Sequence, residues 1–317
     1  MRRQKKVNMK KYIVTTTIYP PSRATLEFCK KKDWGFIIVG DTKTPHDEYR
    51  KLEKKYKQVI YLSPEDQEKK YKKLSDTIGW KCIMRRNIGF VEAYNLGATI
   101  VATIDDDNIP YEDWGKNLYV NKEIILDYYE TELTAFDPLS VTSSNQVWHR
   151  GYPIQLLQKR YEFIYKGKVK RKVLVQADLW DGDPDIDAMA RLSFRPIVNY
   201  SDVLGPYCSN KISPFNSQNT FLSREVLPYY AVIPYVGRMD DIWGGYIMQH
   251  YFPNSVIYNK ATVYQDRNEQ DLITNLEKEV IGYRNTLNLL EDLKNYKKYL
   301  PDESKKFYEV YRKEFKK

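Results

Sequence analysis

Residues 99–110 read Thr99-Ile-Val-Ala-Thr-Ile-Asp105-Asp106-Asp107-Asn108-Ile-Pro110. The first half of this stretch is apolar and β-branched, a pattern typical of a buried strand. The second half places three carboxylates, here called the acidic triplet (Asp105, Asp106 and Asp107), where that strand should end. Adjacent carboxylates repel one another, and a divalent cation or the hydroxyl groups of a ribose or sugar relieve that repulsion. The alternative is an ordinary acidic turn at the surface, so the rest of the chain has to decide.

The chain before this stretch alternates between strand-like and helix-like segments. Strand-like runs cover residues 12–18, 34–39 and 58–62, and a helix-like segment follows each of them. This alternation predicts an α/β fold with a mostly parallel sheet, and such sheets bind ligands at the carboxyl ends of their strands. No Gly-x-Gly-x-x-Gly follows the first strand and no Gly-Lys-Ser/Thr loop occurs, which disfavours a dinucleotide fold and a P-loop ATPase. The polar residues expected at these strand ends are Thr15, Thr16, Thr17 and Asp41, followed by the acidic triplet.

A helix-like segment that begins near Arg85, Arg86 and Asn87 comes just before the acidic strand. Phe90 and Tyr94 lie at helical spacing, which puts either Asn87 or Gly89 at the helix N-terminus. Helix N-termini bind anions, and arginine adds positive charge and paired donors. We therefore favour a phosphate-binding role over the alternative, in which both arginines are merely exposed.

Composition limits the kinds of partner. The chain has 317 residues, of which 14% are aromatic, so it is long enough for a large core and is not expected to be disordered. Lys and Arg number 51 against 42 Asp and Glu, a net charge of +9, and residues 2–11 carry basic but no acidic side chains. Without its basic ends the chain is closer to neutral. The charge therefore fits a phosphate-bearing small ligand better than a nucleic acid.

Cysteine usage and hydropathy bear on the compartment. Cys29, Cys82 and Cys208 lie far apart and show neither metal-ligand spacing nor a disulfide framework. No apolar stretch has the length needed to span a bilayer. We expect a cytoplasmic protein or soluble domain without a transmembrane segment, whose basic termini make at most a weak contact with a membrane surface.

Two polar runs distinguish the second half of the chain. The first, which contains Trp180, Asp181 and Asp183, has alternating acids but lacks the glycine and the distal glutamate of an EF-hand, so that site is excluded. A substrate loop and a structural turn both remain open for it. The second run, residues 214–221, is rich in amides, which orient a ligand or a loop when they are buried. Its amide side chains include Asn216, Gln218 and Asn219.

A second acidic pair, Asp240 and Asp241, begins a helix-like segment that carries Ile247 and Met248 on its buried side. Acids at a helix N-terminus are also ordinary partners of the helix dipole, which is the alternative explanation. Two carboxylate sites far apart in sequence, one for a metal and one for proton transfer, are what glycosyl transfer requires.

Taken together, these motifs resemble nucleotide-sugar glycosyltransferases of the GT-A fold, and more narrowly the STELLO-like family. That family is related to the plant reversibly glycosylated polypeptide and UDP-arabinopyranose mutase group. The run from Trp180 and the amide-rich segment point to the STELLO-like side. The matching motifs, in order, are Arg86-Asn-Ile-Gly-Phe90, the acidic triplet, Arg150-Gly-Tyr-Pro153, Trp180-Asp-Gly-Asp-Pro-Asp-Ile-Asp-Ala188, Phe215-Asn-Ser-Gln-Asn-Thr220 and Asp240-Asp-Ile-Trp-Gly-Gly-Tyr246.

The resemblance implies a Rossmann-like nucleotide-sugar-binding fold with a mostly parallel central sheet and a C-terminal helical extension. The expected domains are a basic tail over residues 1–10, a glycosyltransferase domain over 11–275 and a helical segment over 276–317. Within the large domain, residues 11–110 form the nucleotide-binding half and residues 111–275 the acceptor half.

It also implies a donor site and a metal, Mn²⁺ or Mg²⁺. In GT-A enzymes the first acid of the motif contacts the ribose and the last binds the metal, so these roles pass to Asp105 and Asp107, and Asp106 faces the sugar. The late histidine that many of these enzymes use as a further metal ligand is replaced here by Asp266, so the implied ligands are Asp107, Asp105 and Asp266. The implied nucleotide-sugar-binding residues are Thr15, Thr16, Thr17 and Asp41 at the base, Arg85, Arg86 and Asn87 at the diphosphate, and Asp105 and Asp106.

The acidic pair supplies the catalytic base of an inverting enzyme, and we favour Asp241 over Asp240. Aromatic residues would form the acceptor groove. The implied acceptor and sugar contacts are Trp180, Asp181, Asp183, Asn216, Gln218, Asn219 and Trp243.

The leading hypothesis is therefore a metal-dependent hexosyl- or pentosyltransferase that moves a sugar from a nucleotide donor, UDP-linked, to a glycan or other acceptor. A second is a nucleotide-pentose mutase of the UDP-arabinopyranose mutase type, in which Arg86 carries or positions the sugar and no acceptor is needed. A third is a non-catalytic scaffold of the same fold. Nucleic-acid binding, suggested only by the net charge, ranks last.

Overall fold

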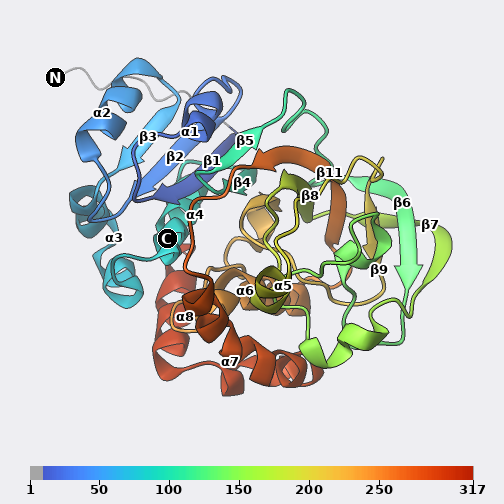
Figure 1. The fold of residues 1–317 in the computed structure, drawn as a ribbon. Helices are drawn as coiled ribbons and strands as arrows, with labels where there is room; N and C mark the ends of the chain where they lie inside the picture. The colour runs from blue at the N-terminus through green and yellow to red at the C-terminus, as the bar shows by residue number, and fades with distance from the viewer. Residues whose placement is uncertain (1–9, 317) are drawn as a thin grey trace.

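The computed structural model describes residues 10–316, so the predicted basic tail lies outside the described residues except for Lys10. Within this range a single eleven-stranded sheet runs through the molecule, with helices packed beside it (Figure 1). The strands are β1 (Lys11–Thr17), β2 (Gly35–Gly40), β3 (Val59–Leu62), β4 (Ile100–Ile104), β5 (Asn108–Pro110), β6 (Glu123–Glu130), β7 (Ile164–Lys172), β8 (Val175–Gly182), β9 (Tyr207–Ser209), β10 (Asn219–Ser223) and β11 (Val256–Gln265).

Helices connect the first strands and close the C-terminal end of the chain. The four helices before β4 separate β1, β2, β3 and β4 in sequence, which is the alternation expected of a parallel sheet. The helices are α1 (Arg23–Phe28), α2 (His46–Lys55), α3 (Pro64–Ile78), α4 (Arg86–Asn95), α5 (Ala188–Ser193), α6 (Asp240–Tyr251), α7 (Leu272–Glu291) and α8 (Asp302–Glu314).

The strand order, β3-β2-β1-β4-β10-β8-β11-β9-β6-β7, matches the expected α/β fold. The first four strands are parallel to one another, β10 is antiparallel to both of its neighbours, and β8 and β11 again run parallel as a pair. Six central strands therefore share one direction, and the mixed α/β architecture is consistent with a GT-A-like fold. Because β4 pairs with β10, the predicted nucleotide-binding and acceptor halves share this sheet.

Strand β5 is short but decides where the acidic triplet lies. It begins directly after the triplet and pairs antiparallel with the end of β11, with Asn108 opposite Gln265. The backbone N–H of Asp266 donates to the Asp107 carbonyl at 3.1 Å. The segment that follows β11 is therefore held beside the triplet.

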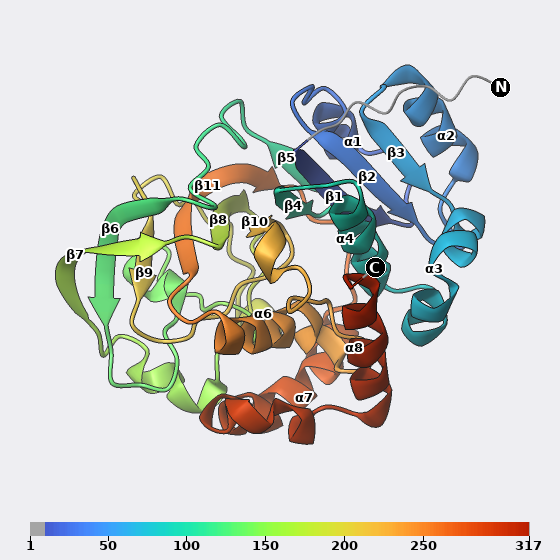
Figure 2. The ribbon, with the colours of Figure 1, turned by 180° about the vertical axis from the view of Figure 1, so that it is seen from behind.

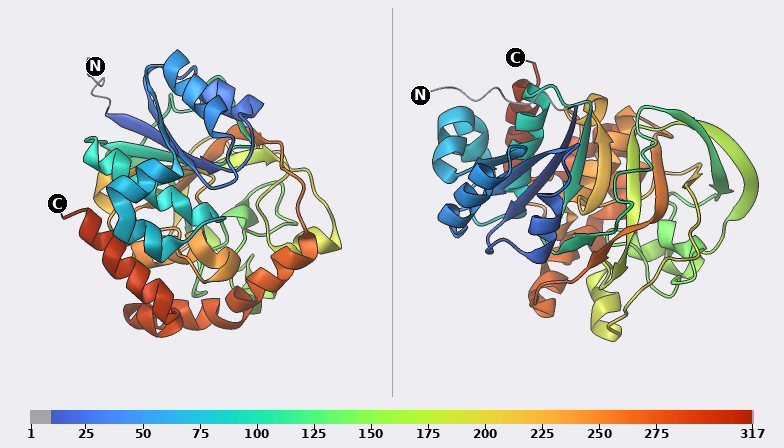
Figure 3. Two further views of the ribbon diagram at one scale, coloured as in Figure 1. Left: turned by 90° about the vertical axis from the view of Figure 1, so that its left-hand side faces the viewer. Right: turned by 90° about the horizontal axis from the view of Figure 1, so that it is seen from above.

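Figures 2 and 3 show the layers from other sides. The β6–β7 hairpin lies at the opposite end of the sheet from β2 and β3, while α6, α7 and α8 gather below the sheet in the view of Figure 2. Helix α4 packs against β1 and β2, and α3 contacts α8. Among residues 10–316, no helix combines the length and the apolar character needed to cross a membrane.

The predicted strands agree with the structure to within one residue at most ends, because each is a continuous buried apolar run. The predicted helix over 271–298 ends earlier, since α7 stops at Glu291 and a 3₁₀ segment, Leu293–Tyr299, follows it. The expected C-terminal helical segment, 276–317, thus contains most of α7, this 3₁₀ segment and α8.

Gly89 offers a test of how α4 packs on the sheet. A Cβ atom at this position would lie 2.4 Å from Cγ1 of Val14 and 3.0 Å from Cγ2 of Val39, both in buried strands. We expect Gly89→Ala to lower the free energy of unfolding by about 1–3 kcal/mol, because overpacking outweighs the helix propensity gained. Denaturant unfolding would measure it. Gly205→Ala is the control, because no atom lies within 4 Å of its Cβ position, and an equal loss there would contradict the packing explanation.

Candidate active site

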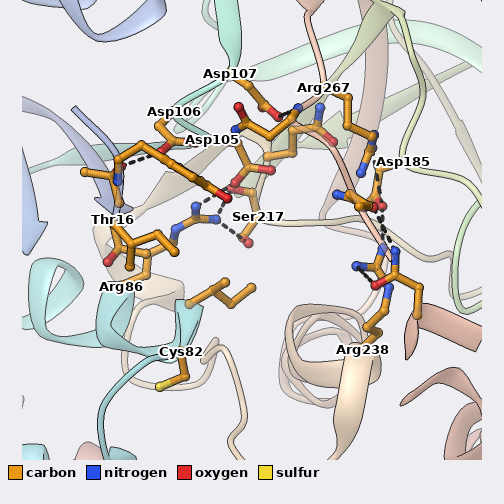
Figure 4. Close-up of a pocket in the computed structure, with 18 of the residues that line it drawn as sticks. Thr16, Cys82, Arg86, Asp105, Asp106, Asp107, Asp185, Ser217, Arg238 and Arg267 are labelled. Atoms are coloured by element: carbon orange, nitrogen blue, oxygen red, sulfur yellow. Dashed lines mark hydrogen bonds and ion pairs between the residues drawn. The ribbon is translucent and has the colours of Figure 1, made fainter. Parts of the chain in front are cut away.

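A cleft of about 500 Å³ opens at the carboxyl ends of β1 and β4. Figure 4 shows that the acidic triplet, Arg86 and Ser217 line one part of it, while Asp185, Arg238 and Arg267 line the part nearer α7. The segment from Arg267 to Asp271, between β11 and α7, also contributes to its wall. The cleft thus lies where ligands of parallel α/β sheets bind.

All three acids of the triplet line the cleft, but they differ in their partners. Asp105 forms an ion pair with Arg86, whose Nη2 lies 2.6 Å from its Oδ1. Asp106 accepts a hydrogen bond from the Thr17 hydroxyl. Asp107 accepts the backbone N–H of Asn268 at 3.3 Å. Only Asp105 of the three therefore has an arginine or lysine within ion-pair distance in the described part of the chain.

The pKa values of Asp106 and Asp107 are both raised. Burial, followed by the charge of Asp105, raises the pKa of Asp107 to about 7, and the charge of Arg267 opposes this shift. Burial also raises the pKa of Asp106, against the effects of its hydrogen bond from Thr17 and of the charge of Arg86. Two half-buried carboxylates that face a cleft without an ion-pair partner among the described residues are suited to bind a cation from outside.

The residues present fit a metal ion that takes only two of its ligands from the protein. Within residues 10–316, no group of three or more His, Cys, Asp or Glu side chains is arranged to hold an ion. Asp266, the implied third ligand, is exposed and lines a smaller hollow beside Asp106 and Asp107 instead of the main cleft. Mg²⁺ is commonly held by one or two carboxylates together with substrate phosphates, so Asp107 and Asp106 would suffice with a diphosphate present.

Arg86 lies at the start of α4 and is the one residue of the predicted phosphate group that reaches the cleft. Its Nη1 donates to the carbonyl and hydroxyl oxygens of Ser217 at 2.8 and 2.6 Å, and its Nη2 donates to Asp105. Its Nε has no hydrogen-bond partner in the described part of the chain. Arg86 therefore bridges the acidic triplet and the amide-rich segment.

Arg85 and Asn87 lie outside the cleft, which corrects their predicted role at the diphosphate. Arg85 is fully buried, with its guanidinium 3.6 Å from the ring centre of Trp80 and its Nε donating to Gln67 at 2.9 Å. The side chain of Asn87 donates to the Val232 carbonyl and accepts its N–H, at 2.7 and 3.0 Å. Both side chains are used in packing the helix.

Some of the residues expected to bind the nucleobase line the cleft, and others do not. Thr16 and Thr17 line the cleft, whereas the hydroxyl of the buried Thr15 donates to the Ile104 carbonyl. Asp41 does not line it either. The carboxylate of Asp41 instead accepts the backbone N–H of Cys82 at 3.1 Å, and so holds the residues around Cys82 that form this end of the cleft.

The second acidic pair begins α6, and only Asp241 lines the cleft. Its Oδ2 accepts the N–H and hydroxyl of Ser217 at 2.7 and 3.0 Å, and its Oδ1 accepts Arg150 Nη2 at 3.0 Å. Burial is the largest influence and raises its pKa, but the charge of Arg150 and the hydrogen bonds from Asp240 and Ser217 together outweigh burial, so the pKa lies below its usual value. Burial and the neighbouring charge of Asp241 raise the pKa of Asp240 well above its usual value. Burial and mutual charge therefore make Asp240 the harder of the two carboxylates to ionise.

Most of the predicted acceptor contacts are buried away from the cleft, which corrects those expectations. Trp243 lies in the core with its Nε1 donating to Thr286, and Trp180 packs edge-on against His149. The other displaced residues are held by protein partners: Asp181 by the Tyr111 hydroxyl, Asp183 by Arg191, Asn216 by Asp185, and Asn219 by Trp114. Gln218 alone lines the cleft.

No protein-family model matches the chain. Two Arabidopsis thaliana proteins are similar to it: "Probable glycosyltransferase STELLO2", 24% identical over 297 residues, and "Probable glycosyltransferase STELLO1", 23% identical over the same length. The resemblance to STELLO-like glycosyltransferases is confirmed. The match covers 84% of this chain but only 38% of either STELLO relative, so the chain spans well under half of their length.

The motifs that carry the STELLO-like resemblance lie far apart in sequence but meet at the cleft. Arg86, the acidic triplet, Arg150, Asp185, Gln218 and Asp241 each come from a different motif, and all of them line it.

Sequence reasoning did not single out several residues of the cleft. Asp185 accepts hydrogen bonds from Arg150, Arg238 and Asn216, and Arg267 lies 3.7 Å from it. Arg150 and Asp185 occur within the motifs that carry the family resemblance. Membership of those motifs is the feature of the sequence that could have placed them in the cleft. Arg238 and Arg267 gave no signal, because Asp185, the carboxylate that both approach in the cleft, lies more than 50 residues from each of them in sequence.

Proposed function

We propose that the chain is a metal-dependent glycosyltransferase that transfers a sugar from a nucleotide donor, UDP-linked, to a glycan or other acceptor with inversion. The observation that supports it most is the separation of two kinds of carboxylate in one cleft. Asp106 and Asp107 have no ion-pair partner among the described residues, whereas Asp241 is paired with Arg150, whose charge lowers its pKa. The names of the STELLO relatives agree with this class of reaction.

In the proposed reaction, Asp107 and Asp106 hold Mn²⁺ or Mg²⁺, which when bound stabilises the charge on the departing nucleoside diphosphate. Arg86 contributes positive charge beside the same group, and its Nε is free to donate. Asp241 accepts the proton of the acceptor hydroxyl as the new glycosidic bond forms on the opposite face of the sugar. Thr16, Thr17 and the residues around Cys82 contact the nucleotide.

Calorimetric titration tests the donor site. UDP, GDP and CDP are titrated with Mn²⁺ and with a chelator. Metal-dependent binding of one nucleotide supports the proposal, whereas no binding of any of them with metal present would contradict both enzymatic hypotheses and favour the scaffold.

One observation favours the mutase as a second candidate. Trp180 and Trp243, which were expected to form an acceptor groove, are both almost fully buried. A mutase needs no acceptor. Incubation with UDP-arabinopyranose and metal, without any acceptor, distinguishes the two: formation of the furanose form supports the mutase, and an unchanged substrate supports the transferase.

Gln218 yields a prediction about the sugar. Its side chain is 2% exposed, and its Oε1 accepts Asn216 Nδ2. Its Nε2 has no partner among residues 10–316, although the residue lines the cleft. A buried donor without a partner costs about 1–3 kcal/mol, so we expect a bound sugar hydroxyl to accept from it. Gln218→Leu should weaken binding of the donor sugar about 5- to 100-fold and leave binding of the free nucleotide unchanged.

Calorimetry with UDP and with a panel of UDP-sugars measures this difference. Asn219→Leu is the contrasting variant, because the Asn219 amide is satisfied by Leu179 and Thr262 and lies outside the cleft. Asn219→Leu should lower the stability of the protein, but it should not change the affinity for a UDP-sugar relative to the affinity for UDP. Equal weakening of both ligands in Gln218→Leu would contradict the assignment.

A further inference from the structure

Arg150 is held against the helix that carries the proposed base. The next residue, Gly151, has a positive φ of 77°, and a Cβ there would lie 2.4 Å from Cγ2 of Ile242 in α6. The Tyr246 hydroxyl, also in α6, donates to the Gly151 carbonyl at 3.0 Å. The backbone that carries Arg150 is therefore packed closely on α6.

Every nitrogen of the Arg150 guanidinium has a partner in the protein. Nε donates to both Asp185 oxygens at 3.1 Å, and Nη2 donates to Asp185 at 2.8 Å and to Asp241 at 3.0 Å. Nη1 donates to the Arg238 carbonyl and lies 3.7 Å from Asp240. The side chain is only 6% exposed. Arg150 thus has little capacity left to bind a substrate and acts on its neighbours.

The two oxygens of Asp241 are used unequally. Oδ2 accepts two hydrogen bonds, both from Ser217, whereas Oδ1 accepts one, from Arg150. Asp240 also shares a hydrogen bond with the Asp241 carboxylate. The contact with Arg150 holds Oδ1 in one orientation in a carboxylate that lines the cleft.

We propose that Arg150 is the positioning residue of the transfer reaction: through its contact with Oδ1 it orients the Asp241 carboxylate toward the acceptor hydroxyl. The inference rests on the proposed function, in which Asp241 is the base. It extends that proposal by assigning the orientation of the base to a residue that belongs to the Arg150–Pro153 motif.

The charges around Asp241 support this assignment. The charged or titratable groups that face it are Arg86, His149, Arg150, Asp185, Tyr230 and Asp240. After burial, which raises the pKa of Asp241, Arg150 has the largest effect and lowers it. Loss of the guanidinium should therefore raise this pKa, so that a higher pH is needed to ionise the base.

Two variants separate charge from geometry. Arg150→Lys keeps the positive charge but loses the planar fork, so we expect kcat to fall about 10- to 100-fold while the acid limb of the pH profile stays within half a unit. Arg150→Gln loses both, so kcat should fall further and the acid limb should move to higher pH by at least one unit. Binding of UDP with Mn²⁺ should remain within threefold of wild type in both.

Arg160→Lys is the matched control. Arg160 is another buried arginine beside an aspartate, with its Nε 3.6 Å from Asp137 Oδ2, but it does not line the cleft. It should lower thermal stability without changing the pH profile.

Each outcome has a distinct meaning. If the wild-type protein binds no nucleotide with metal, the proposed function fails. If nucleotide binding and the loss of activity in Asp241→Asn are as expected but the acid limb of Arg150→Gln stays in place, only the role of Arg150 is overturned. If Arg150→Gln does not fold, Arg150→Lys decides, and an unchanged kcat in that variant would refute the positioning role.

Discussion

Asp107→Asn is expected to abolish the Mn²⁺-dependent binding of a nucleoside diphosphate, with a loss of affinity of at least 100-fold. Asparagine keeps the size and the backbone contacts of Asp107, including the N–H of Asn268 that the side chain accepts. It removes one of the two carboxylates of the triplet that have no ion-pair partner among the described residues, and Mg²⁺-type ions bind anionic oxygen much more strongly than an amide. Calorimetry with UDP, with and without Mn²⁺, measures the effect.

Asp266→Asn is the control for this prediction. Asp266 is exposed and lines only the smaller hollow, although its backbone is bonded to Asp107. We expect Asp266→Asn to change the Mn²⁺-dependent affinity for the nucleotide less than fivefold. A larger loss in Asp266→Asn than in Asp107→Asn would instead favour the ligand set implied by the resemblance. Full metal-dependent binding by Asp107→Asn would refute the proposed metal site.

Asp241→Asn should lower kcat by about 100- to 10,000-fold, the contribution of a well-placed general base, while nucleotide affinity stays near that of wild type. The amide cannot take the proton from the acceptor hydroxyl. It also replaces the ion pair between Arg150 and Asp241 by a contact with a neutral group. A rate assay with the identified donor, together with calorimetry, separates the two effects.

Asp240→Asn is an informative comparison because it resembles the protonated acid that the structure favours at this position. Burial and the charge of Asp241 raise the pKa of Asp240 well above its usual value, which favours its neutral form in the folded protein. We expect less than a tenfold fall in kcat. A loss as large as that of Asp241→Asn would show that Asp240 has a direct part in the reaction.

The strands and the acidic triplet could be predicted because their signals are local. Each central strand is an apolar run whose side chains are buried on both faces, and the triplet comes directly after β4. The C-terminal end of such a strand lies at the edge of the sheet where ligands bind, so a position in the sequence becomes a position in the site.

The roles of neighbouring residues could not be predicted in this way. Arg85 and Arg86 are adjacent, yet one stacks on Trp80 and the other enters the cleft, because successive helical residues point about 100° apart. Asp240 and Asp241 differ for the same reason. The sequence indicates that such a pair is polar, but only the packing of the helix decides which member reaches the ligand.

The tryptophans expected in the acceptor groove show a different limit. Trp180 and Trp243 carry one polar atom each and otherwise behave as large apolar side chains. A pattern of aromatic residues near a polar motif is compatible with a core as well as with a sugar platform. In this fold both side chains are buried in the core, with exposed fractions of 3% for Trp180 and 0% for Trp243.

The pairing of β5 with β11 has a consequence for how the protein is made. The contact between Asp107 and Asn268 joins residues 161 positions apart in the chain. At a synthesis rate of roughly 5–20 residues per second, the triplet leaves the ribosome some 10–30 seconds before the segment that completes its surroundings. The nascent N-terminal half should therefore be unable to retain nucleotide. Nucleotide binding should begin only after the last third of the chain has been synthesised and has folded.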